Sequence, residues 1–156
     1  MLFTILSAQP TDLDQLNNLM YDLHQEHHAQ CPEHFKSADE VVKEKSIASY
    51  LNNPECVIFV AKEQSQIVGF ITGHFCELVS EVSKPVQMGS IDELYVKTDY
   101  RNLGVAKALV EKLEERFEEY GVKQVFVEVW EFNQTAQHFY DKLQFSGHIR
   151  WLRKAL

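Results

Sequence analysis

The sequence has 156 residues, with 15 Lys or Arg against 23 Asp or Glu and a formal net charge of −8 at pH 7. This length predicts a single domain, residues 1–156, whose core needs no disulfide or metal for stability. The negative charge disfavours non-specific nucleic-acid binding, and no apolar run approaches the roughly 20 residues of a membrane helix. The three cysteines are widely spaced, and the N-terminus does not resemble a secretory signal. Both features favour a cytoplasmic protein with reduced thiols.

The N-terminal part of the chain predicts a short strand followed by two helices. Residues 2–7 are mainly apolar, and the Pro-Thr-Asp that begins at Pro10 opens a helix whose leucines recur at intervals of three and four up to about residue 28. Ser37 and Glu40 form a capping-box pattern. This pattern predicts a second helix that ends near residues 52–54.

The middle of the chain predicts three longer strands. Residues 56–61 (CVIFVA) and 66–75 (QIVGFITGHF) are rich in β-branched and aromatic residues, and a polar break separates them. Two such runs predict a hairpin. After a loop that contains Pro85, residues 88–96 form the third predicted strand.

The C-terminal part alternates helices and strands. A helix with apolar residues spaced by four runs to Tyr120, and it is followed by a strand over 122–130, a helix over 133–143 and a last strand over 146–154. The complete order is β-α-α-β-β-β-α-β-α-β. It predicts a layered α/β (α+β) fold and excludes a helix bundle or a β-sandwich.

The connection from the third long strand to the following helix predicts an anion site. Gly104 and Ala106 are small enough to let a bulky ligand approach the backbone, and the first-turn amides of the helix point outward at the positive end of its dipole. Arg101 and Lys107 add positive charge. Because the segment lacks both the P-loop and the G-x-G-x-x-G pattern, its glycine taken alone also fits an ordinary strand-to-helix turn.

Two linked motifs give this segment a more specific meaning. Arg101, Gly104 and Ala106 match the pattern Arg/Gln-x-x-Gly-x-Gly/Ala position by position, and this stretch resembles the acyl-CoA-binding signature of the GCN5-related N-acetyltransferase (GNAT) superfamily. Residues 92–96 (DELYV) resemble the fourth strand of that family. Residues 133–145 (NQTAQHFYDKLQF) resemble its second signature, Asn-x-x-Ala-x-x-Phe-Tyr-x-Lys-x-Gly-Phe.

The sequence departs from the second signature at one position. Gln144 stands where the family has glycine, directly after the helix, and a left-handed conformation there costs about 1 kcal/mol. The departure concerns the turn and not the donor site. The resemblance implies the GNAT fold, a mixed and centrally antiparallel sheet flanked by helices.

The resemblance also implies an activity, namely the transfer of acetyl from acetyl-CoA to a primary amine, by direct attack in a ternary complex and without a metal. A small cationic amine is the favoured acceptor, and a homodimer is expected. The residues that the resemblance places beside acetyl-CoA lie in three segments: Leu94, Tyr95 and Val96; Arg101, Asn102, Leu103, Gly104, Val105 and Ala106; and Asn133, Phe139 and Tyr140.

Acid–base roles follow from the same resemblance. Tyr140 matches the family tyrosine that protonates the departing thiolate, although packing on an apolar helix face is the alternative. Glu93 and Asp92 are the candidate bases. Because side chains alternate along a strand, we expect only one of them to face the site, with Glu93 on the side of Ile91 and Tyr95. A relay through water would need no single base.

The junction of the first two helices lines the acceptor pocket in this family. We therefore expect His28, Glu33 and Phe35 to contact the acceptor. His24 and His28 share a helix face at a spacing that zinc sites use, but an exposed polar helix end explains them without a metal.

Three further interpretations concern packing. Asn133 is either a helix N-cap or a ligand of the pantetheine arm. The acidic run Glu111–Glu119 is expected on a solvated helix face, and the aromatic residues Phe126, Trp130 and Phe132 are expected in the core.

The negative charge is unevenly distributed, since residues 1–100 carry a net −9 and residues 101–156 a net +1. The part that contains the expected acceptor pocket would therefore attract a cationic amine. Two alternatives to a small-amine transferase remain: a protein or peptide N-terminal acetyltransferase, and a regulatory module that binds acetyl-CoA without catalysis.

Overall fold

The computed structural model describes residues 2–156, which form one five-stranded sheet and its flanking helices. In chain order the elements are β1 (Thr4–Ser7), α1 (Leu13–Gln30), α2 (Ala38–Glu44), α3 (Ala48–Leu51), β2 (Cys56–Glu63), β3 (Gln66–Leu78), β4 (Val86–Val96), α4 (Val105–Glu119), β5 (Gln124–Val127) and α5 (Gln134–Lys142), with short 3-10 helices at Pro10–Asp12 and Thr98–Tyr100.

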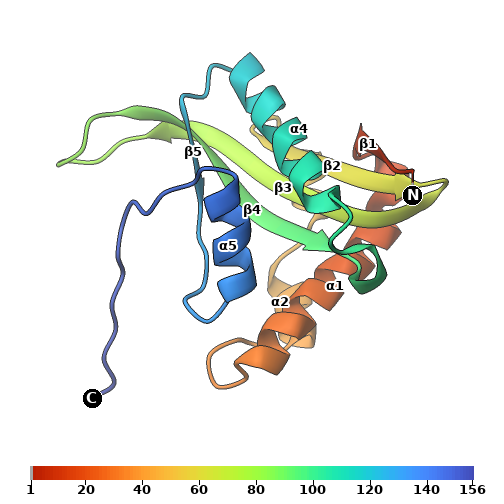
Figure 1. Ribbon diagram of the computed structural model, residues 1–156, viewed down its shortest axis with the longest axis horizontal. Helices are drawn as coiled ribbons and strands as arrows, with labels where there is room; N and C mark the ends of the chain where they lie inside the picture. Colours follow the sequence, from red (N-terminus) through yellow and green to blue (C-terminus); the bar gives the residue numbers. More distant parts are fainter. Residues whose placement is uncertain (1) are drawn as a thin grey trace.

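The strands lie in the sheet in their chain order, β1-β2-β3-β4-β5. The first four are antiparallel to their neighbours, and β5 runs parallel to β4 because α4 provides the crossover between them. The helices cover both faces, with α4 and α5 on one and α1 and α2 on the other (Figure 1). The predicted mixed, centrally antiparallel sheet is thus confirmed.

Each face of the sheet has its own core. On one face Leu109, Leu113 and Phe117 of α4 are fully buried against the sheet. A Cβ atom at Gly89 of β4 would lie 2.5 Å from the Phe117 ring, and one at Gly73 of β3 would lie 3.0 Å from it. These two strand glycines therefore let the helix pack close to the sheet.

The opposite core is formed by α1 and the strands β2, β3 and β4. Leu16, Leu19 and Met20 of α1 are buried there with Val60 of β2 and Phe70 of β3. Their spacing of three and four residues is the stripe that the sequence predicts, and it holds α1 against the face of the sheet opposite to α4.

The second predicted helix is divided into two. Ser37 caps α2 as expected, since the Glu40 amide donates to Ser37 Oγ at 3.3 Å. The helix stops at Lys45, whose backbone is extended (φ −124°, ψ 123°), and α3 starts three residues later. The interruption turns the Lys45 side chain toward the sheet, where it meets Glu93.

Two helix ends have the expected left-handed residues. Gly121 has φ 82° after α4, and Gln144 has φ 69° after α5. Gln144 therefore adopts the conformation that glycine provides in the family signature. Within residues 2–156, no helix combines the length and apolar character needed to cross a membrane.

The expected last strand over residues 146–154 does not form in the single chain. Residues 146–156 run away from the sheet as an extended segment (Figure 1), with Ile149 81% and Trp151 91% exposed. A strand is stabilised by backbone hydrogen bonds to a neighbour, and none of the described residues of the same chain provides one. We call residues 146–156 the C-terminal segment.

Candidate active site

The open edge of β4 is the first element of the site. β5 pairs with β4 only from Met88 opposite Gln124 to Ile91 opposite Val127, whereas β4 continues to Val96. Beyond Ile91 the two strands separate, and β4 pairs only with β3 among the described residues. The edge around Leu94–Val96 can therefore accept an extended ligand by strand addition.

The loop before α4 is the second element. Asn102 and Gly104 have φ of 63° and 84°, and α4 begins at Val105. Because the first helical bond runs from the Ala108 amide to the Gly104 carbonyl, the amides of 105–107 have no acceptor within the helix. A Cβ atom at Gly104 would meet nothing within 4 Å, so the backbone of the expected anion site faces open space.

Arg101 links this loop to the rest of the site instead of standing free. Its Nε donates to the Val96 carbonyl at 2.8 Å, its Nη2 donates to Glu26 Oε1 at 2.8 Å, and its guanidinium lies 5.3 Å from the centre of the Tyr95 ring. The side chain thus fixes the loop to the end of β4 and to α1. The sequence motif gave no indication of the partner on α1.

The α5 residues of the second signature lie beside the α4-side core. Tyr140 is 7% exposed and packs against Phe139 and Phe145, with ring centres 5.0 and 5.3 Å away. Burial raises the pKa of Tyr140. Asn133 Oδ1 accepts from the Ala136 amide at 3.0 Å, which confirms the N-cap interpretation; its contact with pantetheine stays a prediction.

A β-bulge places both candidate carboxylates on one face of the sheet. Thr72 pairs with Glu93 but Gly73 pairs with Ile91, so Asp92 is an extra residue in β4. The expected alternation is therefore wrong here. Asp92 and Glu93 both face α2 and α3, while Ile91 lies in the opposite core, because a bulge interrupts the two-residue period of a strand.

The Glu93 carboxylate is buried, and few polar groups compensate for its loss of hydration. Its side chain is 3% exposed, and Lys45 Nζ lies 3.1 Å from Oε1. The approach of Lys45 is an ion pair without hydrogen-bond geometry, so neither carboxylate oxygen accepts a hydrogen bond from the described residues. Burial raises the pKa of Glu93, and Lys45 opposes this shift. A carboxylate in this position favours the arrival of a cationic donor.

Asp92 has the opposite surroundings, since three side chains bond to it. Oδ2 lies 2.7 Å from His74 Nδ1 and accepts from the Tyr50 hydroxyl at 3.0 Å, and Oδ1 accepts from the Ser90 hydroxyl at 2.8 Å. Sequence reasoning missed Tyr50 and His74. The alternation of the 66–75 strand was the one available signal, since it places His74 on the same face as Thr72.

The expected acceptor residues lie at the junction of α1 and α2, with His28 in the last turn of α1 and Glu33 and Phe35 in the loop that follows. His28 Nδ1 donates to the Phe35 carbonyl at 2.8 Å, and Glu33 is exposed and accepts from the Cys31 thiol at 3.3 Å. His24, one turn before His28, is partly buried; burial, together with Lys45, lowers its pKa to about 4. The two histidines therefore have separate surroundings.

An aromatic cluster joins this loop to the segment between β5 and α5. The Phe35 ring lies 4.7 Å from the Trp130 ring and 5.8 Å from the Phe132 ring, between centres. Trp130 and Phe132 are 42% and 39% exposed. The prediction that they belong to the core is wrong, because β5 ends before them and they project from a loop.

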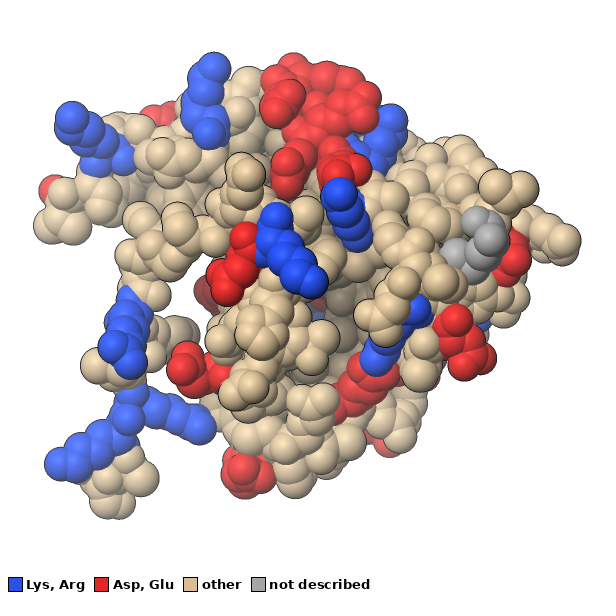
Figure 2. Space-filling model, viewed as in Figure 1, with Lys and Arg blue, Asp and Glu red and all other residues tan. Residues whose placement is uncertain are grey.

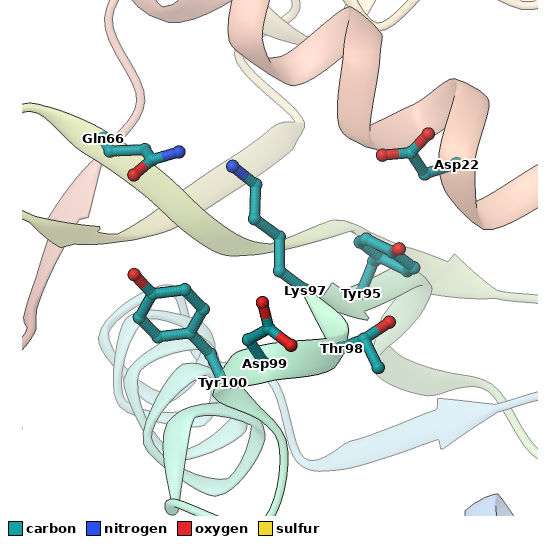
Figure 3. A pocket seen from close by; sticks show the side chains of 7 residues that line it. All are labelled: Asp22, Gln66, Tyr95, Lys97, Thr98, Asp99 and Tyr100. Carbon is teal, nitrogen blue, oxygen red and sulfur yellow. The ribbon is translucent and has the colours of Figure 1, made fainter.

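A hollow of about 480 Å³ lies at the C-terminal end of β4, between Asp22 of α1, Gln66 and the turn over residues 97–100 (Figure 3). Lys97 points into it, and Tyr95 forms part of its wall. Asp92, Glu93 and Tyr140 do not line it, so the hollow adjoins the donor edge without including the reacting centre.

Comparison with known proteins identifies the family of this chain. The model of the Acetyltransferase (GNAT) family matches residues 18–145. An uncharacterized N-acetyltransferase of Mycobacterium tuberculosis (strain ATCC 25618 / H37Rv) is 30% identical over 118 residues, which cover 75% of this chain and 70% of that protein. The crystal structure of an acetyltransferase from Vibrio fischeri has 53% identity and a TM-score of 0.69, covering 81% of this chain and 96% of that one.

A more distant structure covers nearly the whole chain. The aminoglycoside N-acetyltransferase AAC(6')-Iy in complex with CoA has a TM-score of 0.78 at 17% identity, over 99% of this chain and 95% of that one. At this identity the likeness shows the fold alone. The family model covers most of the chain, and the curated relative meets it over two thirds of its own length. The chain belongs to the GNAT family and is an N-acetyltransferase.

Proposed function

We propose that this protein transfers acetyl from acetyl-CoA to the primary amine of a small cationic molecule, in a ternary complex without a covalent enzyme intermediate. The observation that carries the proposal is the bulge at Asp92. It turns two carboxylates toward one face of β4 at the point where β4 and β5 separate. A thioester held along the open edge would then have an amine-attracting face beside its carbonyl carbon.

The donor site uses backbone groups more than side chains. The amides at the start of α4 suit the pyrophosphate of acetyl-CoA, and the open space over Gly104 leaves room for it. The edge at Leu94–Val96 suits the amide-rich pantetheine arm, with Asn133 and Phe139 on the α5 side. A backbone amide of the same edge would stabilise the oxyanion that forms on the thioester.

Proton transfers set the remaining requirements. An alkyl ammonium has a pKa of about 10.4, so forming the neutral amine near pH 7 costs roughly 4–5 kcal/mol unless the site assists. Asp92 and Glu93 provide the negative charge that holds the ammonium while its proton leaves. Tyr140, whose pKa is raised by burial, keeps its proton and is suited to protonate the departing thiolate.

The acceptor side matches a cation in two respects. Glu93 is a buried carboxylate that accepts no directed hydrogen bond from the described residues, and Lys45 shows that an ammonium fits beside it. The aromatic cluster around Phe35 and Trp130 offers ring faces, which attract cations. Among structural neighbours, the aminoglycoside N-acetyltransferase is named for an amine-rich acceptor. Together with His28 and Glu33, these groups would form the acceptor site.

Release of free thiol from acetyl-CoA across an amine panel tests the proposal. The panel contains polyamines, aminoglycosides, amino acids and peptides with free N-termini. We expect turnover with at least one small cationic amine. Turnover restricted to the peptides would replace the proposal with N-terminal acetylation. Silence across the panel, with acetyl-CoA binding measurable by calorimetry, would indicate a regulatory module without catalysis.

We also propose that the protein is a homodimer in which the C-terminal segment docks on a second copy. The segment exposes three large apolar side chains to water, which is unfavourable in a monomer. These are Ile149 at 81%, Trp151 at 91% and Leu152 at 75% exposure. The segment carries Arg150, Arg153 and Lys154 on an otherwise acidic protein, and positive side chains are seen in Figure 2 at the lower left, where Figure 1 shows the C-terminal segment. The exposed apolar side chains favour burial against a second copy of this chain, and the positive charge of the segment favours the acidic surface of that copy.

Light scattering measures the oligomeric state directly. We expect about twice the 18.1 kDa of one chain, and a monomer for a variant that ends at Phe145. A full-length monomer would contradict the dimer without affecting the proposed chemistry. We place the protein in the cytoplasm, because acetyl-CoA is made available there and the thiols of Cys31, Cys56 and Cys76 are unpaired.

A further inference from the structure

We propose that His74 is the base that takes the proton from the acceptor ammonium, and that Asp92 acts by holding the His74 ring. This inference rests on the proposed function and deepens it, since it assigns the proton acceptor within the same site. It is carried by the cluster of Tyr50, His74, Ser90 and Asp92, which three segments of the chain bring together.

The position of Asp92 places this cluster at the reacting end of the donor edge. β4 and β5 are last paired at Ile91, and Asp92 is the next residue and the bulged one. Its side chain is 16% exposed, and that of His74 is 40% exposed. The carboxylate is therefore enclosed, while the imidazole is partly open to solvent and accessible to an acceptor.

The hydrogen bonds fix the state of both side chains. An ionised carboxylate only accepts, so the three neighbours of Asp92 must all donate to it. Nδ1 of His74 then carries a proton, so in the neutral ring Nε2 is the nitrogen with the free lone pair. Tyr50 and Ser90 occupy further lone pairs of Asp92, so its negative charge is held in place and orients the ring.

Glu93 is less suited to the same task. Its carboxylate is 3% exposed and already paired with Lys45. We assign it the charge that holds the ammonium after the acceptor displaces Lys45. Two adjacent carboxylates thus have different roles: Asp92 acts through His74, and Glu93 acts on the acceptor.

The proton and bond changes balance as follows. The ammonium gives one proton to Nε2 of His74, and the free amine attacks the thioester carbon. The N–C bond forms and the C–S bond breaks. The thiolate takes a proton from Tyr140, and the extra proton on the new amide nitrogen passes through water to restore Tyr140. His74 returns its proton to solvent. The products are the amide, CoA with a free thiol, and one proton.

The variant His74→Asn tests the base directly. Its side-chain NH₂ can replace Nδ1–H as a donor to Asp92, but it has no basic nitrogen at the position of Nε2. We expect kcat to fall about 100- to 1000-fold, with the Kd for acetyl-CoA changed less than about twofold. His138→Asn, in the exposed surface of α5, is the matched control and should retain the wild-type kcat.

A second variant distinguishes catalysis from packing. His74→Ala leaves a hole beside Asp92 that free imidazole can enter. We expect added imidazole to raise the kcat of His74→Ala at least about tenfold. The kcat of His74→Asn should not change, because the asparagine fills the hole. A structural role for His74 would show no such rescue.

Asp92→Asn tests the positioning role with a readout other than rate. The ¹⁵N resonances of the His74 ring report which nitrogen carries the proton. We expect the Nδ1-protonated form in the wild type and its loss in Asp92→Asn, together with a fall in kcat. A wild-type ring protonated on Nε2 would overturn the inference.

The outcomes separate this inference from the function on which it rests. A wild type without turnover on any amine contradicts the proposed function. An active wild type whose His74→Asn variant keeps its kcat overturns only the role of His74. Loss of kcat in His74→Asn, with rescue of His74→Ala by imidazole, supports both.

Discussion

The two sides of β4 differ in how the chain builds them. On the side proposed for acetyl-CoA, the open edge, the loop and the start of α4 come from one continuous stretch, residues 92–107. On the acceptor side, Tyr50 and His74 reach Asp92 from 42 and 18 residues away in the sequence. A site for a common donor can be encoded locally, because backbone amides and one glycine provide most of it. A site that recognises one acceptor needs side chains from several elements.

The largest expected effect that would test this division belongs to Tyr140. Tyr140→Phe removes the proposed acid and keeps the ring that packs on Phe139 and Phe145. We expect kcat to fall about 100-fold or more, with an unchanged Kd for acetyl-CoA. Tyr120→Phe, at the exposed end of α4, is the control. Full turnover by Tyr140→Phe would leave Tyr140 as a packing residue only.

Gly104 tests whether the donor side is a backbone site. In Gly104→Val, a valine at φ 84° carries roughly 1–2 kcal/mol of left-handed strain, and we expect the loop to relieve it by leaving its present conformation. We expect the Kd for acetyl-CoA to rise about tenfold and the KM for the amine to stay the same. Gly121→Val has the same strain at φ 82°, away from the site, and should change stability without changing this Kd. Equal effects of both variants would show that the loop does not bind the donor.

Glu93 tests the acceptor side by two measurements. We expect Glu93→Gln to raise the KM for a cationic amine about tenfold, because the buried charge that holds the ammonium is lost. Glu114→Gln on α4, whose carboxyl also has a pKa raised by burial, should leave this KM unchanged. A similar KM in both variants would remove Glu93 from the acceptor site.

The same variant has a pH-dependent effect on stability. Since burial raises the pKa of Glu93, the folded state holds this proton more tightly than the unfolded chain does. The free energy of unfolding of the wild type is therefore reduced as pH rises from the unfolded pKa of about 4.3 through the raised folded value. Urea titrations should show that the free energy of unfolding of Glu93→Gln rises relative to that of the wild type across this range and stays higher at neutral pH. An unchanged difference would mean that Glu93 keeps its ordinary pKa.

The smallest expected effect concerns the net charge of −9 over residues 1–100. Added salt screens the attraction of a cationic amine, so kcat/KM for such an acceptor should fall a few-fold between about 0.05 and 0.5 M salt. A less charged amine acceptor should show little change. An equal salt dependence of both acceptors would show that the uneven charge does not attract the acceptor.

The structure confirms most of the local predictions and revises those that depend on pairing between strands. The cap at Ser37, the left-handed Gln144 and the solvated acidic face of α4 follow from short patterns, and each is present. The alternation of Asp92 and Glu93 fails because the bulge is defined by the register of β3 on β4. Trp130 and Phe132 are more exposed than predicted because β5 stops at Val127.

The sequence by itself determined the order of most elements up to α5, the apolar stripes that α1 and α4 bury and the conformation of the helix ends. These depend on periodicity, on glycine at a left-handed position and on helix ends, which are properties of neighbouring residues. Only the tertiary structure decided that Asp92 and Glu93 share a face, that His74 and Tyr50 bond to Asp92, and that the C-terminal segment pairs with no strand among the described residues. The physical reason is that strand register and hydrogen bonds between distant segments form only when the whole sheet is assembled.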